Sequence, residues 1–132
     1  MIEVKDVEKS FDGKKILHTI NATFQDGITN LIIGQSGSGK TVLMKSLVGL
    51  LKPDHGAILF DGRDITSISA NQIKELRKEI GMLFQGSALF DSETVLGNVM
   101  FPLKMFSDLS PAEQLDRAHF CIERVNLKDA DN

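Results

Sequence analysis

The chain has 132 residues and a formal net charge of −3. This length suits one modest domain, since folded domains most often contain roughly 100 to 150 residues. The acidic balance and the lack of a polybasic tract exclude the broad positive field that holds a nucleic-acid backbone, so we expect no nucleic-acid partner. The one cysteine, Cys121, excludes an internal disulfide framework, and its helical neighbours favour a small buried hydrophobe over a reactive thiol.

The N-terminal stretch MIEVKDVEK is charged and alternating, which is unlike an export signal. No apolar run approaches the ~18 residues that a membrane-spanning helix needs. We therefore expect the protein to lie in the cytoplasm. The histidines His18, His55 and His119 are far apart and lack cysteine or carboxylate neighbours at ligand spacing, so we expect no metal site built on them.

The early part of the chain predicts strands joined by tight turns. Ile2 and Val4 alternate with charged residues, which predicts a strand with one solvated face. Asp-Gly pairs, which suit turns with positive φ, follow at residues 12–13, 26–27 and 61–62. The sequence therefore predicts antiparallel hairpins in this region.

Strand and helix patterns then alternate up to about residue 90. The unbroken apolar run ITNLII (28–33) predicts a strand buried on both faces, and TVLMKSLVGLL (41–51) predicts a helix. GAILF predicts a strand, Ser69 with Gln72 predicts a capping box for the helix NQIKELRKE, and IGMLFQ (80–85) predicts a further strand. Residues 92–126 predict only helix and loop. The fold class is therefore α/β, with one compositional boundary that separates residues 1–90 from residues 91–132.

The run GQSGSGKT (34–41) fits the pattern G-x-x-x-x-G-K-[ST] between a predicted strand and a predicted helix. Glycines let backbone N–H groups converge on a nucleotide's phosphates, and the helix that begins near Gly39 adds the positive end of its dipole. Lys40 is placed to reach the β- and γ-phosphates, and the Thr41 hydroxyl to bind Mg²⁺. The alternative, a glycine-rich turn that binds nothing, need not end in Lys-Thr at such a junction. Kinases, GTPases, helicases and transport ATPases share this loop, so other residues must identify the class.

Segments on both sides of the loop carry a family resemblance. Before it comes IEVKDVEKSFDGKKILHTINATFQDG, and after it come LLKPDHGAILFDGRDI and EIGMLFQGSALFDSETVLGNVMFPL. In this order and spacing, essentially the whole chain resembles the first half of an ATP-binding-cassette (ABC) ATPase. PDHGAILFDG and MLFQGSALFDSETVLGNVMFPL are most similar to the ATPase subunit of the Mla, or Mkl-type, lipid transporters. The resemblance implies a P-loop NTPase fold: residues 1–90 form part of a RecA-like core with an antiparallel β-subdomain, and residues 91–132 begin a helical subdomain.

The resemblance also implies roles for matching residues. Phe11 occupies the position of the aromatic that stacks on adenine, where the family more often has tyrosine; the alternative is a strand residue that covers the core. Gln85 matches the glutamine that contacts Mg²⁺ or the attacking water, so Lys40 and Gln85 are the implied catalytic residues and Thr41 and Gln85 the implied metal ligands. The implied ATP-binding residues of the loop are Gly34, Gln35, Ser36, Gly37, Ser38, Gly39, Lys40, Thr41 and Val42.

Two residues depart from the family pattern. Val42 stands where the family usually has a second hydroxyl residue that can bond a phosphate, so we expect weaker ATP affinity rather than none. Gly97 stands in TVLGNV where relatives commonly carry glutamate, and a glycine inside a helix costs roughly 1 kcal/mol against alanine. We expect that helix to start later or to kink there.

The run LSPAEQLDRA (109–118) is only superficially similar to the family's LSGGQ signature. The signature needs two glycines after the serine, and Pro111 and Ala112 stand there instead. Ser110, Pro111 and Glu113 predict a capped helix start, followed by an apolar stripe of Leu115, Ala118, Ile122 and Val125.

Other catalytic parts of the family are missing from these residues. No run of four apolar residues ending in Asp-Glu occurs, so the acidic Walker B strand and its catalytic glutamate are absent. The signature and the switch histidine are also missing from these residues. We therefore expect the chain to be an N-terminal piece, truncated before the signature and the Walker B strand, that does not hydrolyse ATP alone. Its uncovered sheet edges favour self-association.

For the intact protein, the resemblance implies an ATPase subunit of a membrane transporter, with lipid as the expected cargo. Two copies would sandwich two ATP molecules with Mg²⁺ and drive a membrane permease from the inner face of the cell membrane. The expected contact surface includes Gln85 and the segment TVLGNVMFPLKMF. The alternative is a soluble ABC ATPase that acts on the ribosome or on DNA.

Overall fold

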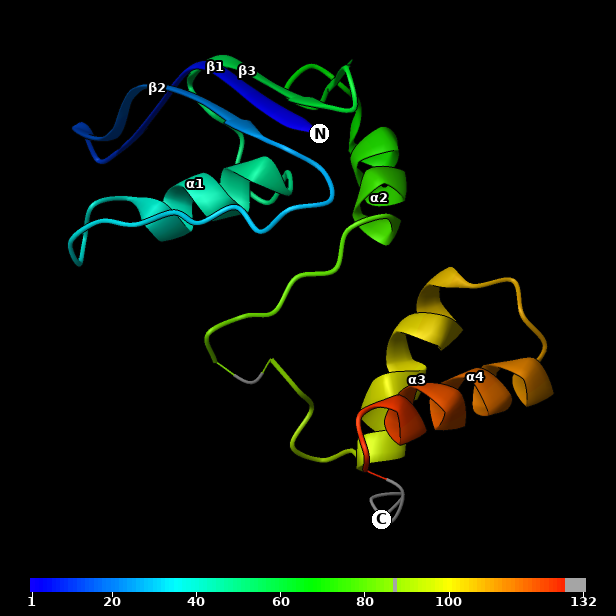
Figure 1. Ribbon diagram of the computed structural model, residues 1–132. Coiled ribbons are helices and arrows are strands. Elements are labelled where there is room, and N and C mark those ends of the chain that lie inside the picture. Colours follow the sequence, from blue (N-terminus) through cyan, green and yellow to red (C-terminus); the bar gives the residue numbers. More distant parts are fainter. Residues whose placement is uncertain (87, 128–132) are drawn as a thin grey trace. The chain divides into compact units, whose positions relative to one another are not determined.

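The computed structural model describes residues 1–86 and 88–127. It divides the chain into two compact units, Met1–Gly81 and Met82–Asn132. Figure 1 shows a sheet and helices in the first unit and helices in the second. The elements are β1 (Ile2–Phe11), β2 (Lys14–Phe24), α1 (Lys40–Leu47), β3 (His55–Phe60), β4 (Arg63–Asp64), α2 (Ala70–Lys78), α3 (Val95–Phe106) and α4 (Pro111–Arg124).

The sheet has the strand order β2-β1-β3-β4, and each neighbouring pair is antiparallel. The Asp12–Gly13 turn joins β1 to β2, and the Asp61–Gly62 turn joins β3 to β4. All four turn residues have φ between 47° and 76°, as a two-residue hairpin with the right-handed strand twist requires. The predicted hairpins at residues 12–13 and 61–62 are therefore confirmed, whereas the Asp26–Gly27 pair does not join two strands.

One face of this sheet packs on α1. The buried side chains come from β1, β2 and β3, from α1, and from the segment that runs from β4 into α2. The core cluster consists of Val4, Val7, Leu17, Leu43, Leu47, Ile58, Ile65 and Leu76. This packing fixes α1, and therefore the loop before it, against the sheet.

Two predicted strands are not formed in the described residues. The segment 28–33 pairs with no strand there, and the exposed fractions of Leu31 and Ile33 are 80 % and 81 %. Segment 80–85 is also irregular, and Leu83 is 95 % exposed. A strand needs a partner for its backbone N–H and C=O groups, and the four strands of the sheet pair among themselves. The predictions of strands at 28–33 and 80–85 are therefore wrong for this structure.

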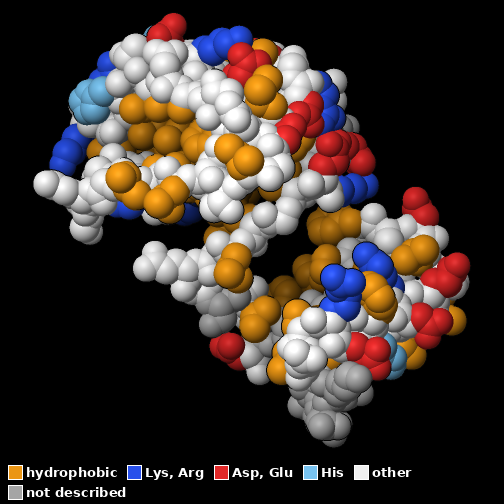
Figure 2. Space-filling view, viewed as in Figure 1, with side chains coloured by type: hydrophobic (Ala, Val, Ile, Leu, Met, Phe, Trp, Pro, Cys, Tyr) orange, Lys and Arg blue, Asp and Glu red, His pale blue; other side chains and the backbone are white. Residues whose placement is uncertain are grey.

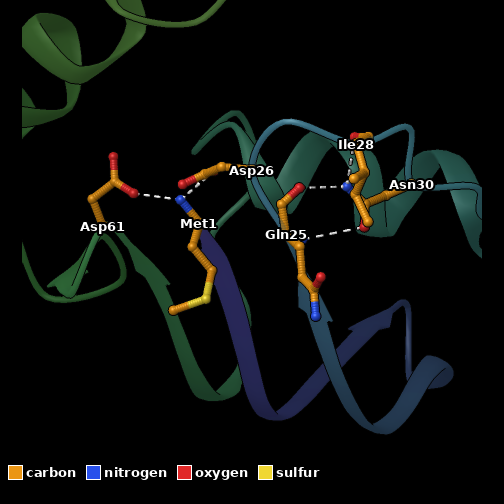
Figure 3. Close-up of polar contacts among 6 residues, drawn as sticks. All are labelled: Met1, Gln25, Asp26, Ile28, Asn30 and Asp61. Carbon is orange, nitrogen blue, oxygen red and sulfur yellow. Dashed lines mark hydrogen bonds and ion pairs between the residues drawn. The ribbon is translucent and has the colours of Figure 1, made fainter.

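Hydrogen bonds between Asn30 and Gln25 hold the start of segment 28–33, which follows β2. Asn30 Nδ2 donates to the Gln25 main-chain oxygen at 2.8 Å, and the Gln25 N–H donates back to Asn30 Oδ1 at 3.2 Å (Figure 3). Nearby, the Met1 amino group contacts the carboxylates of Asp26 and Asp61, which raise the pKa of that amino group.

Figure 2 shows hydrophobic side chains on the surface of the first unit. Within segment 28–33, the exposed hydrophobic residues are Ile28, Leu31 and Ile33.

The second unit is built from α3 and α4. Ser110 caps α4 with a complete capping box to Glu113, and Pro111 stands in the first turn, as predicted. Of the predicted stripe, Ala118 and Ile122 are buried, whereas Leu115 and Val125 are exposed. Among the described helices, none is long and apolar enough to cross a membrane.

Helix α3 begins at Val95, two residues before Gly97, so the expectation of a later start is wrong. Thr94 caps this helix, because its hydroxyl accepts a hydrogen bond from the Gly97 N–H at 3.0 Å. Glycine is tolerated because it lies in the first turn, at the third helical position, rather than in the helix interior. Pro102 lies inside α3.

Candidate nucleotide site

Gly39, near the end of the glycine loop, lies against β2. Gly39 is the N-cap of α1 and has φ 91°, a left-handed conformation that favours glycine. A Cβ added there would lie 3.0 Å from Leu17 Cδ2 and 3.1 Å from Ile16 Cγ2. Both the backbone angle and the lack of space therefore require glycine at this position. The contact places the loop at the N-terminal end of α1 and against the strand that pairs with β1.

The side chain of Lys40 is hydrogen-bonded to the main chain at the start of the glycine loop. Its ammonium group donates to the main-chain oxygens of Gly34 at 2.8 Å and Gln35 at 2.7 Å. The Ser38 N–H also donates to the Gln35 oxygen, at 3.2 Å. The cation is therefore held beside the backbone groups that the sequence motif assigns to phosphate binding. A phosphate oxygen arriving here would meet a positive group already in place.

The first turn of α1 offers further donors and no competing acid. Leu43 is the residue whose N–H makes the first backbone bond of the helix, to the Gly39 oxygen at 2.9 Å, and the first turn contains no acidic side chain. The earlier N–H groups and the positive end of the helix dipole suit an anion. Thr41 is exposed, whereas Val42 packs against the core. Thr41 can therefore present its hydroxyl to a ligand, and Val42 can offer only its backbone.

The Thr41 hydroxyl fits the chemistry of Mg²⁺. That ion usually takes one or two protein ligands, several waters and the oxygens of substrate phosphates, so it does not need a cage of side chains. Within residues 1–86 and 88–127, no group of three or more His, Cys, Asp or Glu side chains could hold a metal ion. One hydroxyl beside a phosphate loop is the arrangement that a nucleotide-borne Mg²⁺ would use.

Phe11 lies at the end of β1, opposite Lys14 on β2. It is 42 % exposed and is not part of the buried core cluster. Lys14 stands two residues before Ile16, which contacts Gly39, so the hairpin that carries Phe11 also contacts the end of the glycine loop. The exposed ring offers an apolar face for stacking.

Gln85 belongs to the second unit, whereas the glycine loop and Phe11 belong to the first. Its side chain is exposed, and the residue lies in an irregular segment rather than at the end of a strand. The role expected for Gln85 therefore continues to rest on the sequence resemblance.

Sequence reasoning missed two charged residues beside Phe11. The Lys9 ammonium group lies 5.5 Å from the centre of the Phe11 ring and 2.7 Å from Asp54 Oδ1. Lys9 and the Ser10 N–H together lower the pKa of the Asp54 carboxyl. The spacing of two residues along a strand could have identified Lys9, but nothing local could have connected Asp54, 45 residues away.

A separate pocket of about 590 Å³ lies between β4 and α2. Ile65, Ile68 and Leu76 contribute its apolar lining, and Arg63 at its edge is already paired with Glu79 at 2.7 Å. It contains none of the predicted site residues.

Comparison with known proteins decides the family. The sequence profile described as "ABC transporter" matches residues 17–132. The chain belongs to the ABC transporter family. It is 41 % identical to the methionine import ATP-binding protein MetN of Rhizobium johnstonii, over 98 % of this chain and 35 % of that protein. It is also 41 % identical to the probable ribonucleotide transport ATP-binding protein mkl of Mycobacterium leprae, over 96 % of this chain and 36 % of that protein. The ABC chain thus spans about a third of the length of these relatives.

Solved ABC cassettes have the same fold. The dimeric ATP-binding cassette MJ0796 in a post-hydrolysis state bound to ADP and Pi has a TM-score of 0.88 and 28 % identity, over 100 % of this chain and 61 % of that chain. The cassette cbiO1 of Clostridium perfringens has a TM-score of 0.83 and 30 % identity, over 99 % of this chain and 52 % of that chain. The predicted α/β class and the ABC type of P-loop fold are therefore confirmed.

Proposed function

We propose that the chain is the ATP-binding part of an ABC ATPase that couples ATP binding and hydrolysis to transport across a membrane. The observation that carries this proposal is the position of the Lys40 ammonium group, held inside the glycine loop at the N-terminus of α1. The exposed ring of Phe11 lies on the hairpin that contacts the same loop. A cation that can donate hydrogen bonds to phosphate, together with an aromatic surface on which a base can stack, suits a nucleoside triphosphate.

Each residue then has a defined part in ATP binding. The backbone N–H groups of residues 34–42 hold the phosphates, and Lys40 exchanges its two carbonyl acceptors for phosphate oxygens. Phe11 stacks on adenine, and Thr41 supplies a hydroxyl ligand to Mg²⁺. Mg²⁺, when bound with the nucleotide, would neutralise phosphate charge. We assign Gln85 the family's role at the ion or the attacking water.

The transport part of the proposal rests on the relatives. The curated relatives are named as ATP-binding proteins of import or transport systems, and MJ0796 is described as a dimeric transporter cassette. We propose a homodimer in the intact protein, docked on a permease at the cytoplasmic face of the membrane. We propose lipid as the cargo because the segments around Gln85 and in α3 resemble Mkl-type lipid-transporter ATPases, although the mkl relative itself is named for ribonucleotide transport.

Isothermal titration of the purified protein with Mg²⁺ and ATP tests nucleotide binding. We expect saturable binding that Lys40→Ala weakens about 10- to 150-fold, because hydrogen bonds to charged groups contribute about 1.5–3 kcal/mol. Lys45→Ala, in the last turn of the same helix, is the matched control and should leave the affinity unchanged. Equal affinities of wild type and Lys40→Ala would refute the proposal.

Reconstitution with the copurifying permease in phospholipid vesicles tests the cargo. We expect ATP-dependent movement of labelled phospholipid and none of labelled methionine. Movement of methionine alone would replace lipid with the cargo named for MetN.

A further inference from the structure

A charged pair lies against the aromatic ring at the end of β1. The Lys9 ammonium group stands 5.5 Å from the centre of the Phe11 ring, within the range of about 6 Å at which a cation is attracted to a ring face. The same ammonium group is 2.7 Å from Asp54 Oδ1. The Lys9 side chain is only 17 % exposed, so it is restrained rather than free in solvent.

Asp54 is itself fixed to the backbone of β1. Its Oδ2 accepts a hydrogen bond from the Ser10 N–H at 2.7 Å, and its own N–H donates to the Glu8 oxygen at 2.8 Å. The carboxylate therefore bridges the Lys9 side chain and the main chain beside Phe11. The lowered pKa of Asp54 agrees with a carboxylate that is ionised and held by these donors. Two elements, β1 and the turn before β3, thus define where the ammonium group lies.

We propose that Lys9, held by Asp54, is a positioning residue for Phe11 in ATP binding. The cation rests against one part of the ring and limits its rotation, while the 42 % exposed surface of Phe11 stays open to adenine. A ring that is already ordered loses less side-chain entropy when a base stacks on it. The inference rests on the proposed role of Phe11 as the adenine platform. It predicts that Lys9 strengthens binding of the base and does not change binding of the phosphates.

The test compares ATP with inorganic tripolyphosphate, which contains the phosphates without the base. Affinities for both are measured with the purified protein as wild type, Lys9→Met, Phe11→Ala and the double variant. Lys9→Met should weaken ATP binding about two- to twelvefold, which corresponds to the cost of ordering one side chain on binding, and should leave tripolyphosphate binding unchanged. In the Phe11→Ala background, Lys9→Met should have no further effect, because no ring remains to be positioned.

Further variants separate positioning from general damage. Lys9→Arg keeps a cation that can pair with Asp54 and should restore wild-type affinity. Asp54→Asn keeps an acceptor for the Ser10 N–H but loses the charge that holds Lys9, so it should weaken ATP binding in the same direction as Lys9→Met. Lys15→Met is the matched control, since Lys15 makes a comparable 2.7 Å ion pair, with Glu8, on the neighbouring strand. It should leave both affinities unchanged.

The outcomes distinguish this inference from the proposed function. If Phe11→Ala weakens ATP binding but Lys9→Met does not, the positioning role is wrong and the nucleotide site stands. Equal losses for ATP and tripolyphosphate in Lys9→Met, or the same loss in the Phe11→Ala background, would also overturn it. If Phe11→Ala leaves ATP binding unchanged, the adenine platform and the positioning role both fail.

Discussion

The Lys40 ammonium group donates a hydrogen bond to the main-chain oxygen of Gly34 at 2.8 Å, across the glycine loop. A second bond, to the Gln35 oxygen at 2.7 Å, holds the same group. Both acceptors are neutral carbonyls, whereas a phosphate oxygen carries negative charge and adds Coulombic attraction to the ammonium group. Phosphate oxygens should therefore displace the two carbonyls as acceptors of the Lys40 ammonium group.

Val42→Thr should strengthen ATP binding roughly three- to tenfold, since it adds a hydroxyl donor in the first turn of α1 that can reach a charged phosphate. The same change should lower the free energy of unfolding by about 1 kcal/mol, because Val42 packs against the core and threonine has one methyl group fewer to pack there. Titration calorimetry and urea unfolding measure the two effects. Val42→Ala, the control, should lose stability without any gain in affinity, and no gain for threonine would mean that the missing hydroxyl is unimportant.

Gly97→Gln should stabilise the helical unit more than Gly97→Ala. Alanine removes the glycine penalty, which is about 0.5–1 kcal/mol in a helix interior and smaller in the first turn, where Gly97 lies. Glutamine can in addition accept from the Thr94 N–H and complete the capping box that Thr94 begins. A new Cβ would lie 2.4 Å from Glu93 Oε2, the movable end of a side chain, and glutamine avoids a second carboxylate there. Urea unfolding checks the order glutamine above alanine above glycine, and a loss of stability in both variants would contradict it.

Phe106→Asp should reduce capture of the membrane permease in a pull-down from detergent extracts. Phe106 ends α3 and is 55 % exposed, within the segment that we expect to dock on the permease. A buried charge without a partner would disfavour that contact. Phe120→Asp, at a 46 % exposed position of α4, is the control and should bind normally. Undiminished capture by Phe106→Asp would remove this residue from the interface.

Residues 1–132 alone should not sustain ATP hydrolysis. They contain no apolar strand ending in Asp-Glu and no LSGGQ signature, so the general base and the group that closes the site are missing. A phosphate-release assay over many enzyme equivalents of ATP measures this. Turnover that Lys40→Ala abolishes would show that these residues contain a complete catalytic site.

Local features of the fold could be predicted from neighbouring residues. The capping box at Ser69 and Gln72 and the turn at Asp12–Gly13 both form as predicted, because each depends on atoms a few residues apart. The glycine loop is similar, since Lys40 and Gly34 are six residues apart. The sequence could therefore locate the loop that we propose as the phosphate-binding part of the site.

Features that depend on distant partners could not be predicted. The apolar run 28–33 indicates burial in a sheet, but its residues find no partner strand in the described parts of the chain. The contact of Lys9 with Asp54 joins residues 45 positions apart and leaves no local pattern. Strand pairing and ion pairs between elements are set by tertiary packing, which composition and spacing do not encode.

A structure of the protein with Mg²⁺ and a non-hydrolysable ATP analogue tests the central claim most directly. We predict that the Lys40 ammonium group leaves the oxygens of Gly34 and Gln35 and lies about 3 Å from a β- or γ-phosphate oxygen. Thr41 Oγ1 should then face the ion. A nucleotide bound away from residues 34–42, with Lys40 still bonded to the two carbonyls, would contradict the assignment of this loop as the ATP site.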